Sequence, residues 1–439
     1  MSALARYFHS QGKKVSGYDK TETVLTQQLE AEGIAVHYDD WGLGVLDKYS
    51  HNDTQVIYTP AVPEEMGELK AFKEHGFDVI KRAKALGIIS QEFETYAVAG
   101  THGKTTTSSI LAHVLNSTLE RCNAFIGGIT SNYDSNFILN PGSNCVVVEA
   151  DEFDRSFLHL QPTHAIVTSM DSDHLDVYGD GSTLRKSFNE FLNLIKYGGT
   201  LMLNSQIDLT DFEFTTELRV ITYGIASGSD YRLHAMKYEN GKFYFDILGY
   251  GEIYRNIEFG LPGQHNAENA TAVFALCLQQ GIPEKTIRSA FASFKGVKRR
   301  FEFRLRRDDI VVIDDYAHHP TEIEAFLRSV RKLYPNKKIT AVFQPHLYSR
   351  TRDFMDEFAD ALENADELFL LPIYPAREEP IKGVTSEALL ELVNIDDKHM
   401  STLNDIARDI KKFDNEVICI IGAGDIDTTV EPIAKAYAQ

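Results

Sequence analysis

Short apolar runs that alternate with helical segments constrain the fold of this chain more than any other feature of its sequence. Runs such as Cys145–Val148 and Ala165–Thr168 carry polar residues only at or beyond their C-terminal ends. Strands with such continuous apolar character are buried on both faces, and their alternation with helices is typical of a parallel sheet. We therefore predict an α/β fold in which ligands bind beyond the carboxyl ends of the strands.

The chain has 439 residues, which at roughly 150 residues per domain suggests about three domains. Strand and helix signals fall into three blocks, which begin at the N-terminus, near Phe93 and near Gly296. We predict domains at residues 1–93, 94–295 and 296–439. The predicted strands are Lys14–Asp19, Gln55–Thr59, Tyr96–Ala99, Cys145–Val148, Ala165–Thr168, Ile310–Ile313, Ile339–Phe343, Leu368–Leu371 and Val417–Ile420, and the predicted helices are Thr21–Glu32 and His102–Asn116.

Charge and composition exclude some classes of function. The chain carries 44 basic and 64 acidic residues, a formal charge of −20, whereas nucleic-acid-binding proteins usually present a basic face. No apolar run approaches the roughly 18 residues needed to span a membrane, and the first residues lack a secretory pattern. The four cysteines are scattered without metal or redox spacing, which is typical of free thiols in the cytoplasm. We expect a cytoplasmic protein with no nucleic-acid or membrane partner, either a monomer or a homodimer.

A glycine-rich loop, Gly-Thr-His-Gly-Lys-Thr-Thr-Thr at 100–107, follows one predicted strand and leads into a helix. This order places backbone N–H groups and a helix N-terminus around an anion. The loop has two residues between its glycines, where the common phosphate-binding loop has four. In such loops the lysine, here Lys104, neutralises phosphates, and the following hydroxyl, here Thr105, binds Mg²⁺. The alternative is a glycine turn that caps a helix. The predicted ATP-binding residues are Gly100, Thr101, His102, Gly103, Lys104, Thr105 and Thr106.

Acidic residues follow the next two predicted strands. The segment Glu149–Asp154 holds four carboxylates in six residues, and these repel one another unless cations lie nearby. Mg²⁺ prefers a few carboxylates, waters and phosphate oxygens, and Glu149 is the first choice as its ligand because it lies at the strand end. The alternative is a solvated acidic loop. His174, in Asp171–Asp176, is a candidate ligand of a second metal or of a phosphate, although a lone histidine is more often structural.

The segment Leu261–Ala270 reads as a turn that feeds a helix. Asn266 and Asn269 each offer a donor and an acceptor, which suits recognition of an adenine edge. Helix capping by asparagine is an equally good interpretation.

The third block places charged residues near two of its strands. Asp315 lies at a strand end, where a carboxylate can accept a hydrogen bond from a ribose hydroxyl, and it is followed by His318-His319-Pro320. Arg300 and Arg350 have the guanidinium group that stabilises a transferred phosphoryl group or pairs bidentately with a carboxylate. Surface charge is the alternative interpretation.

Taken together, these segments resemble the Mur ligase family. Two of them favour the branch of that family that joins L-alanine to UDP-N-acetylmuramate, namely DDYAHHPTE and FQPHLYSRTRDF. The segments that carry the resemblance are AGTHGKTTT (Ala99–Thr107), EADEFD (Glu149–Asp154), DSDHLD (Asp171–Asp176), LPGQHNAENA (Leu261–Ala270), KRRFEF (Lys298–Phe303), DDYAHHPTE (Asp314–Glu322) and FQPHLYSRTRDF (Phe343–Phe354).

The resemblance implies a Rossmann-like N-terminal domain that binds the UDP-sugar, a central P-loop ATPase-like domain, and a Rossmann-like C-terminal domain that binds the amino acid. It also implies a reaction of peptidoglycan precursor synthesis. The muramate carboxylate attacks the γ-phosphate of ATP, the amine of L-alanine then attacks the acyl phosphate, and ADP and phosphate are released.

Roles for single residues follow from the same resemblance. Lys104 would act in phosphoryl transfer, and Thr105, Glu149 and His174 would bind metal. His265 and Asn266 match adenine-side contacts. Arg300 and Asp315 match ATP contacts that the C-terminal domain makes on closure, which also excludes water. His346 and Arg350 match positions near the incoming amino acid, whose carboxylate Arg350 would hold.

Two departures from the family pattern stand out. The family begins with a strand and a glycine-rich loop that cradles the UDP pyrophosphate, and here Met1–Ala5 is the first segment present. We therefore expect the N-terminal domain to be truncated at its start, with Asp19 as a possible ligand contact. Some relatives use a carbamylated lysine after the DHxD segment, and neither Arg185 nor Lys186 is assigned to that position.

Three alternatives stay open. The first is the recycling ligase that joins a whole tripeptide to the same UDP-sugar. The second is a nucleotide-binding protein that is inactive because its N-terminal loop is missing. A folate polyglutamylating ligase matches these segments less well.

Overall fold

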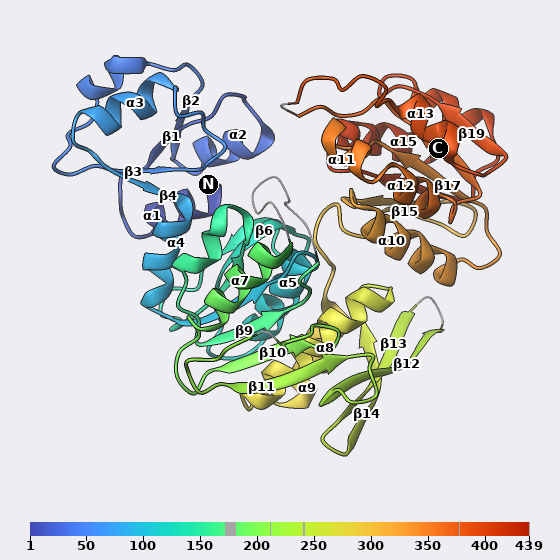
Figure 1. The fold of residues 1–439 in the computed structure, drawn as a ribbon, viewed down its shortest axis with the longest axis horizontal. Coiled ribbons are helices and arrows are strands. Elements are labelled where there is room, and N and C mark those ends of the chain that lie inside the picture. Colours follow the sequence, from blue (N-terminus) through green and yellow to red (C-terminus); the bar gives the residue numbers. More distant parts are fainter. Residues whose placement is uncertain (172–180, 211, 240–241, 377, 439) are drawn as a thin grey trace. The chain divides into compact units, whose positions relative to one another are not determined.

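The computed structural model describes residues 1–171, 181–210, 212–239, 242–376 and 378–438. The chain divides into two compact units, and Figure 1 follows its course. The first unit comprises Met1–Ala235, Phe245–Ile257 and Glu268–Phe294, and the second comprises Met236–Tyr244, Glu258–Ala267 and Lys295–Gln439. Helices and strands alternate over much of the chain, which confirms the predicted α/β class. The exceptions are the successive strands β6 to β8 and β10 to β14, and β6 pairs with β7 in the antiparallel sense. Within the described ranges, no helix has the length and apolar character needed to cross a bilayer.

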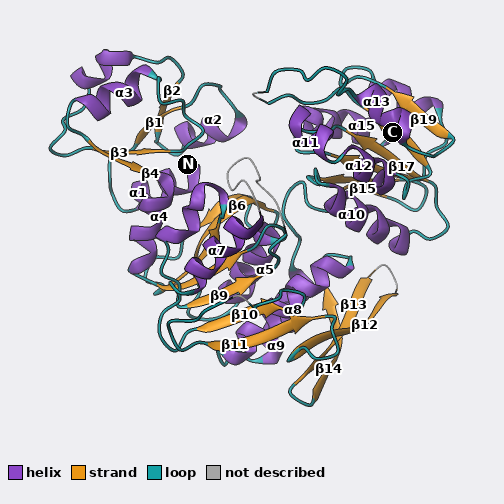
Figure 2. Ribbon diagram, viewed as in Figure 1, coloured by secondary structure: helices purple, strands orange, loops and turns teal. Residues whose placement is uncertain are grey.

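The first part of the chain forms two separate pairs of parallel strands, β1 with β2 and β3 with β4 (Figure 2). Two of these strands confirm predicted ones, at Ser16–Tyr18 and Gln55–Tyr58. Thr23 caps helix α2 by accepting the N–H of Thr26, because a threonine at this position satisfies an orphan amide. The elements are α1 (Ser2–Ser10), β1 (Ser16–Tyr18), α2 (Val24–Ala31), β2 (Ala35–His37), η1 (Gly42–Asp47), β3 (Gln55–Tyr58), α3 (Gly67–Glu74), β4 (Asp78–Lys81) and α4 (Arg82–Gln91).

A ten-stranded sheet follows, with the strand order β14-β13-β12-β11-β10-β9-β5-β8-β6-β7. Strand β5 pairs in parallel with β8 on one side and with β9 on the other. Ala99, the last residue of β5, lies opposite Ala150 of β8 and Val167 of β9. The strands are β5 (Glu94–Ala99), β6 (Asn123–Thr130), β7 (Ser135–Ile138), β8 (Cys145–Ala150), β9 (His164–Val167), β10 (Thr200–Asn204), β11 (Arg219–Gly224), β12 (Tyr231–Glu239), β13 (Lys242–Gly249) and β14 (Glu252–Phe259).

This register brings the glycine loop, the acidic segment and the residues after β9 to one edge of the sheet, as the carboxyl-end rule predicts. Helix α5 packs against β5, β6 and β8. It begins at Lys104, two residues later than predicted, because Gly103 has a left-handed φ of +83° that is incompatible with a helix interior. The helical elements are α5 (Lys104–Asn116), η2 (Phe153–His159), α7 (Gly181–Leu192), α8 (Gln264–Gln279) and α9 (Glu284–Ser293).

A six-stranded sheet forms the core of the second unit, in the order β15-β16-β20-β17-β18-β19. Val311 and Ile313 of β16 belong to one buried apolar cluster and Val312 to another, so the sheet is covered on both faces. The elements are β15 (Glu302–Arg306), β16 (Val311–Asp315), α10 (Pro320–Leu333), β17 (Ile339–Phe343), α11 (Tyr348–Asp353), α12 (Met355–Leu362), β18 (Glu367–Leu370), α13 (Ser386–Leu392), β19 (Asp397–Met400), α14 (Ile406–Asp409), η3 (Ile410–Lys412), β20 (Val417–Ile421), η4 (Asp425–Thr429) and α15 (Val430–Tyr437).

Candidate functional site

The glycines of the loop after β5 are required by its shape. Gly100 has a φ of +135°, and a Cβ atom at this position would lie 2.1 Å from Thr168 Oγ1. At Gly103, with φ +83°, a Cβ atom would lie 3.1 Å from Asn269 Oδ1. Any larger residue at Gly100 would therefore displace the loop from the end of β9, and Asn269 lies beside the loop.

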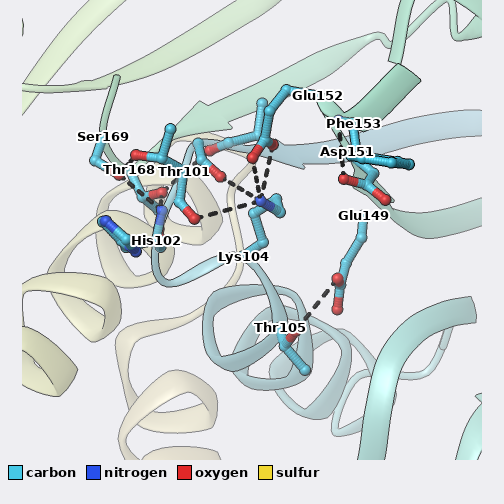
Figure 3. A network of polar contacts seen from close by, with 12 residues as sticks. Thr101, His102, Lys104, Thr105, Glu149, Asp151, Glu152, Phe153, Thr168 and Ser169 are labelled. Atoms are coloured by element: carbon cyan, nitrogen blue, oxygen red, sulfur yellow. Dashed lines mark hydrogen bonds and ion pairs between the residues drawn. The ribbon is translucent and has the colours of Figure 1, made fainter. Parts of the chain in front are cut away.

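The residues after β9 hold the loop in place (Figure 3). The Ser169 hydroxyl accepts the N–H of His102 at 2.9 Å and lies 2.8 Å from Thr101 Oγ1. The Thr168 hydroxyl donates to the carbonyls of Ala99 and His102. Thr168 and Ser169 were not among the predicted site residues, although their position at the end of a buried strand was a usable signal.

The start of helix α5 is suited to an anion. Among the described residues, no side chain caps this helix, whose N-cap is Gly103. The first amides of a helix have no partner within the helix, and its dipole makes this end positive. Thr105 and Thr106, in the first turn, are buried. The glycine loop and the uncapped start of α5 therefore lie together at the sheet edge, where the sequence predicted a phosphate site.

Lys104 is held by its own loop and by a carboxylate from the acidic segment (Figure 3). Its Nζ donates to the Gly100 carbonyl at 2.6 Å and to the two carboxylate oxygens of Glu152 at 3.0 and 2.8 Å. The Glu152 side chain is fully buried, whereas that of Lys104 is 15% exposed. Both residues belong to segments predicted to form the site, but the ion pair between them was not predicted.

Two other carboxylates of the acidic segment also pair with cations. Asp154 accepts from Lys81 Nζ at 2.7 Å, and this hydrogen bond raises the pKa of Lys81. Asp151 lies 3.5 Å from the guanidinium of Arg82. Both cations come from the junction of β4 and α4. The repulsion expected within this segment is therefore relieved by cations that the protein itself supplies.

Glu149 has partners of a different kind. Its carboxylate accepts from the Thr105 hydroxyl at 3.3 Å, from the Ser108 hydroxyl at 3.2 Å and from the Gly127 N–H at 2.6 Å. The structure thus brings the predicted metal ligands Thr105 and Glu149 together. In the parts of the chain that are described, no cluster of three or more His, Cys, Asp or Glu forms a metal cage. One carboxylate and one hydroxyl are the incomplete oxygen set typical of Mg²⁺, which completes its shell with waters and substrate phosphates.

The structure says less about three other predicted residues, His174, His265 and Asn266. His174 lies outside the described residues. Asn266 is buried, and its Nδ2 donates to the Pro262 carbonyl at 2.7 Å. Burial lowers the pKa of the neighbouring His265 to about 4.

Asp315 ties together two segments of the second unit. Its carboxylate accepts the N–H of Phe301 at 2.7 Å and the N–H of Ala317 at 2.8 Å. Burial raises the pKa of Asp315 to about 6 and that of the adjacent Asp314 to about 7. Arg300, which precedes Phe301, lies with its guanidinium 5.8 Å from the centre of the Tyr316 ring.

His318, His346 and Arg350 lie near one another after β16 and β17. The rings of His318 and His346 are 6.0 Å apart, and His346 stacks on Tyr374 at 5.6 Å. Burial, aided by His318 and Arg350, lowers the pKa of His346 to about 4, so its imidazole is neutral at pH 7. His319 differs, because its side chain caps helix α10.

Comparison with known proteins accounts for all three blocks. Residues 1–94 match the model of the Mur ligase family catalytic domain. Residues 98–277 match the Mur ligase middle domain, and residues 299–424 match the Mur ligase glutamate ligase domain. The chain belongs to the Mur ligase family.

Relatives of this Mur ligase include curated proteins and solved structures. The UDP-N-acetylmuramate–L-alanine ligase of Flavobacterium psychrophilum is 49% identical over 436 residues, which cover 99% of this chain and 95% of the relative. The crystal structure of the UDP-N-acetylmuramate–alanine ligase from Thermotoga maritima has a TM-score of 0.82 and 27% identity, covering 100% of this chain and 96% of that one. A murein peptide ligase from Psychrobacter arcticus shares the fold, with a TM-score of 0.71 and 22% identity over 99% and 96% of the two chains.

Proposed function

We propose that this Mur ligase joins L-alanine to the carboxylate of UDP-N-acetylmuramate, with ATP converted to ADP and phosphate. The observation that carries the proposal is the 49% identity to a ligase of that name over 99% of the chain. The glycine loop before α5 and the carboxylate of Glu149 support this proposal. The loop has the amides that bind a phosphate, and the carboxylate is a suitable ligand for the metal ion that accompanies ATP.

Roles for the first step follow from phosphoryl-transfer chemistry, which is mostly positioning and charge neutralisation. The loop amides and Lys104 hold the triphosphate while the muramate carboxylate attacks. Thr105 and Glu149 would hold Mg²⁺, and such an ion would supply positive charge beside the phosphate oxygens. His174 is proposed as a ligand of a second metal ion.

Roles for the second step are assigned to the second unit. Arg350 binds the carboxylate of L-alanine, because a guanidinium pairs bidentately with that group. His346 lies beside Arg350 and is assigned to the same amino-acid site, where its imidazole is neutral. Arg300 and Asp315 contribute to the ATP site, and His265 and Asn266 to its adenine side.

The domain boundaries and the compartment are part of the same proposal. We assign residues 1–93 to UDP-sugar binding, 94–295 to ATP binding and 296–439 to amino-acid binding, in line with the ranges that the three family models match. All four cysteines carry free thiols, three of them buried, which accords with work in the reducing cytoplasm.

Phosphate release in the presence of ATP, Mg²⁺ and UDP-N-acetylmuramate tests the proposal. L-alanine is compared with the tripeptide L-Ala-γ-D-Glu-diamino acid as acceptor. Release that depends on L-alanine is expected. Release with the tripeptide alone would assign the recycling reaction instead, and no release with either acceptor would favour a nucleotide-binding protein without ligase activity.

A further inference from the structure

The ion pair between Lys104 and Glu152 joins two segments 48 residues apart in sequence. An ammonium group has three N–H donors. Around Lys104 Nζ, the Gly100 carbonyl accepts at 2.6 Å, and both carboxylate oxygens of Glu152 are also within hydrogen-bond distance. The ammonium group is therefore oriented by protein atoms before any phosphate is bound.

Electrostatics favours each partner of this pair when the other is present. Lys104 is the first residue of α5, where the helix dipole disfavours a cation. Glu152 is fully buried, and a buried carboxylate is strongly destabilising when its charge is not compensated. If Lys104 moved away to bind a phosphate, Glu152 would lose this compensation.

The hydrogen bond from Lys104 to the Gly100 carbonyl is weaker than its ion pair with Glu152. The carbonyl carries no net charge, and the Gly100 peptide belongs to the loop that approaches the phosphate. A triphosphate oxygen can take the donor that Lys104 gives to this carbonyl without leaving a charge buried. The two carboxylate contacts then stay in place.

We propose that Glu152 is a positioning residue of the ATP site, which fixes the Lys104 ammonium and remains paired with it when the triphosphate replaces the Gly100 carbonyl. The inference rests on the ATP-dependent function proposed above. Glu152 touches neither substrate nor metal in this scheme, and it acts through Lys104 alone.

Equilibrium binding of Mg-ATP and of AMP tests the proposal without UDP-sugar or L-alanine, so its outcome is separate from that of the ligase assay. Glu152→Gln is expected to weaken Mg-ATP binding about tenfold or more and to leave AMP binding within about twofold, because Lys104 contacts the β- and γ-phosphates. Equal weakening for both nucleotides would mean that the site has collapsed, which overturns the proposal. Tighter ATP binding would show that Glu152 competes with phosphate, which also overturns it.

A double-mutant cycle with Lys104→Met shows whether Glu152 acts through the lysine. The double variant is expected to bind Mg-ATP as weakly as Lys104→Met alone. A further loss equal to that of Glu152→Gln in the wild type would assign Glu152 an independent role, for example as a metal ligand, and would overturn the proposal.

Thermal unfolding supplies a second readout from the same variants. Lys104→Met removes the ammonium group that pairs with the buried Glu152 carboxylate, so the double variant is expected to melt at a higher temperature than Lys104→Met. A double variant that melts no higher contradicts the proposal. Asp154→Asn is the matched control, because it removes a carboxylate of the same segment that pairs with Lys81, and its ATP affinity is expected to stay within about twofold of the wild type.

Discussion

Asp315 Oδ2 accepts the backbone N–H of Phe301 at 2.7 Å, which ties the end of β16 to the arginine-bearing segment before β15. The Tyr316 N–H donates to the Arg299 carbonyl at 2.6 Å and strengthens the same junction. The two segments were identified separately in the sequence, and in the structure these hydrogen bonds join them. Arg300, which lies between the two backbone contacts, is thereby fixed at the carboxyl edge of the sheet.

Asp314 makes the stability of the second unit depend on pH. Its folded pKa, raised by burial to about 7, lies above the value of 3.8 for an unhindered aspartate, so the folded state binds the proton more tightly. This stabilisation is complete at pH values below 3.8 and is lost as the pH rises through 7. Between pH 6 and 8 the wild type should lose roughly 1 kcal/mol more stability than Asp314→Asn.

Urea denaturation of both proteins at pH 6 and pH 8 measures this difference. His265 and His346, whose folded pKa values are lowered from 6.5 to about 4, take up protons in the unfolded state within this window. Their contribution is common to wild type and variant, so it cancels in the comparison. Equal pH dependence in wild type and variant would show that Asp314 is ionised throughout.

Gly100→Ala tests whether the close approach of Thr168 requires a glycine at this position of the loop. The new methyl group would lie 2.1 Å from Thr168 Oγ1, so we expect loss of measurable Mg-ATP binding. Gly281→Ala is the matched control, because Gly281 also has a positive φ, +79°, but nothing lies within 4 Å of its Cβ position. That variant should cost about 1–2 kcal/mol of stability and keep its ATP affinity. ATP binding by Gly100→Ala at the wild-type level would contradict the steric account.

Glu149→Gln tests the metal ligand. Loss of its charge should raise the Mg²⁺ concentration for half-maximal phosphate release on the order of tenfold or more. Ser108→Ala removes one of the hydrogen bonds that orient Glu149 and should have a smaller effect in the same direction. The measurement is a Mg²⁺ titration at saturating ATP. An unchanged Mg²⁺ requirement in Glu149→Gln would remove this residue from the metal site.

Arg350→Ala tests the amino-acid site. The KM for L-alanine should rise by about tenfold or more while the KM for ATP stays within about twofold, because a carboxylate clamp contributes to binding of that substrate alone. Arg352→Ala is the control, since Arg352 lies on the same helix, is largely exposed and pairs with Asp353 at 2.7 Å. Steady-state kinetics with each substrate varied in turn measure both KM values. Equal increases in both KM values would point to a general disturbance of the second unit.

The predicted strands after which candidate residues lie were confirmed because their signals are local. Apolar runs such as Ile339–Phe343 specify a buried strand by themselves, and this one has the predicted bounds. The strands β12, β13 and β14 had no counterpart in the sequence analysis. Burial alternates along β13, Lys242–Gly249, whereas β12 and β14 are largely exposed over part of their length. Such strands lack the continuous apolar run that predicts a buried strand.

The sequence alone determined the α/β class, the glycine loop and the choice of Thr105 and Glu149 as residues of one site, because each follows from residue type at short spacing or at adjacent strand ends. Tertiary structure alone decided which cation meets which carboxylate. Lys104 pairs with Glu152, and Lys81 pairs with Asp154, 73 residues away. Any of several cations could compensate an acidic segment, and the choice depends on distances that exist only after the strands have paired and the helices have packed.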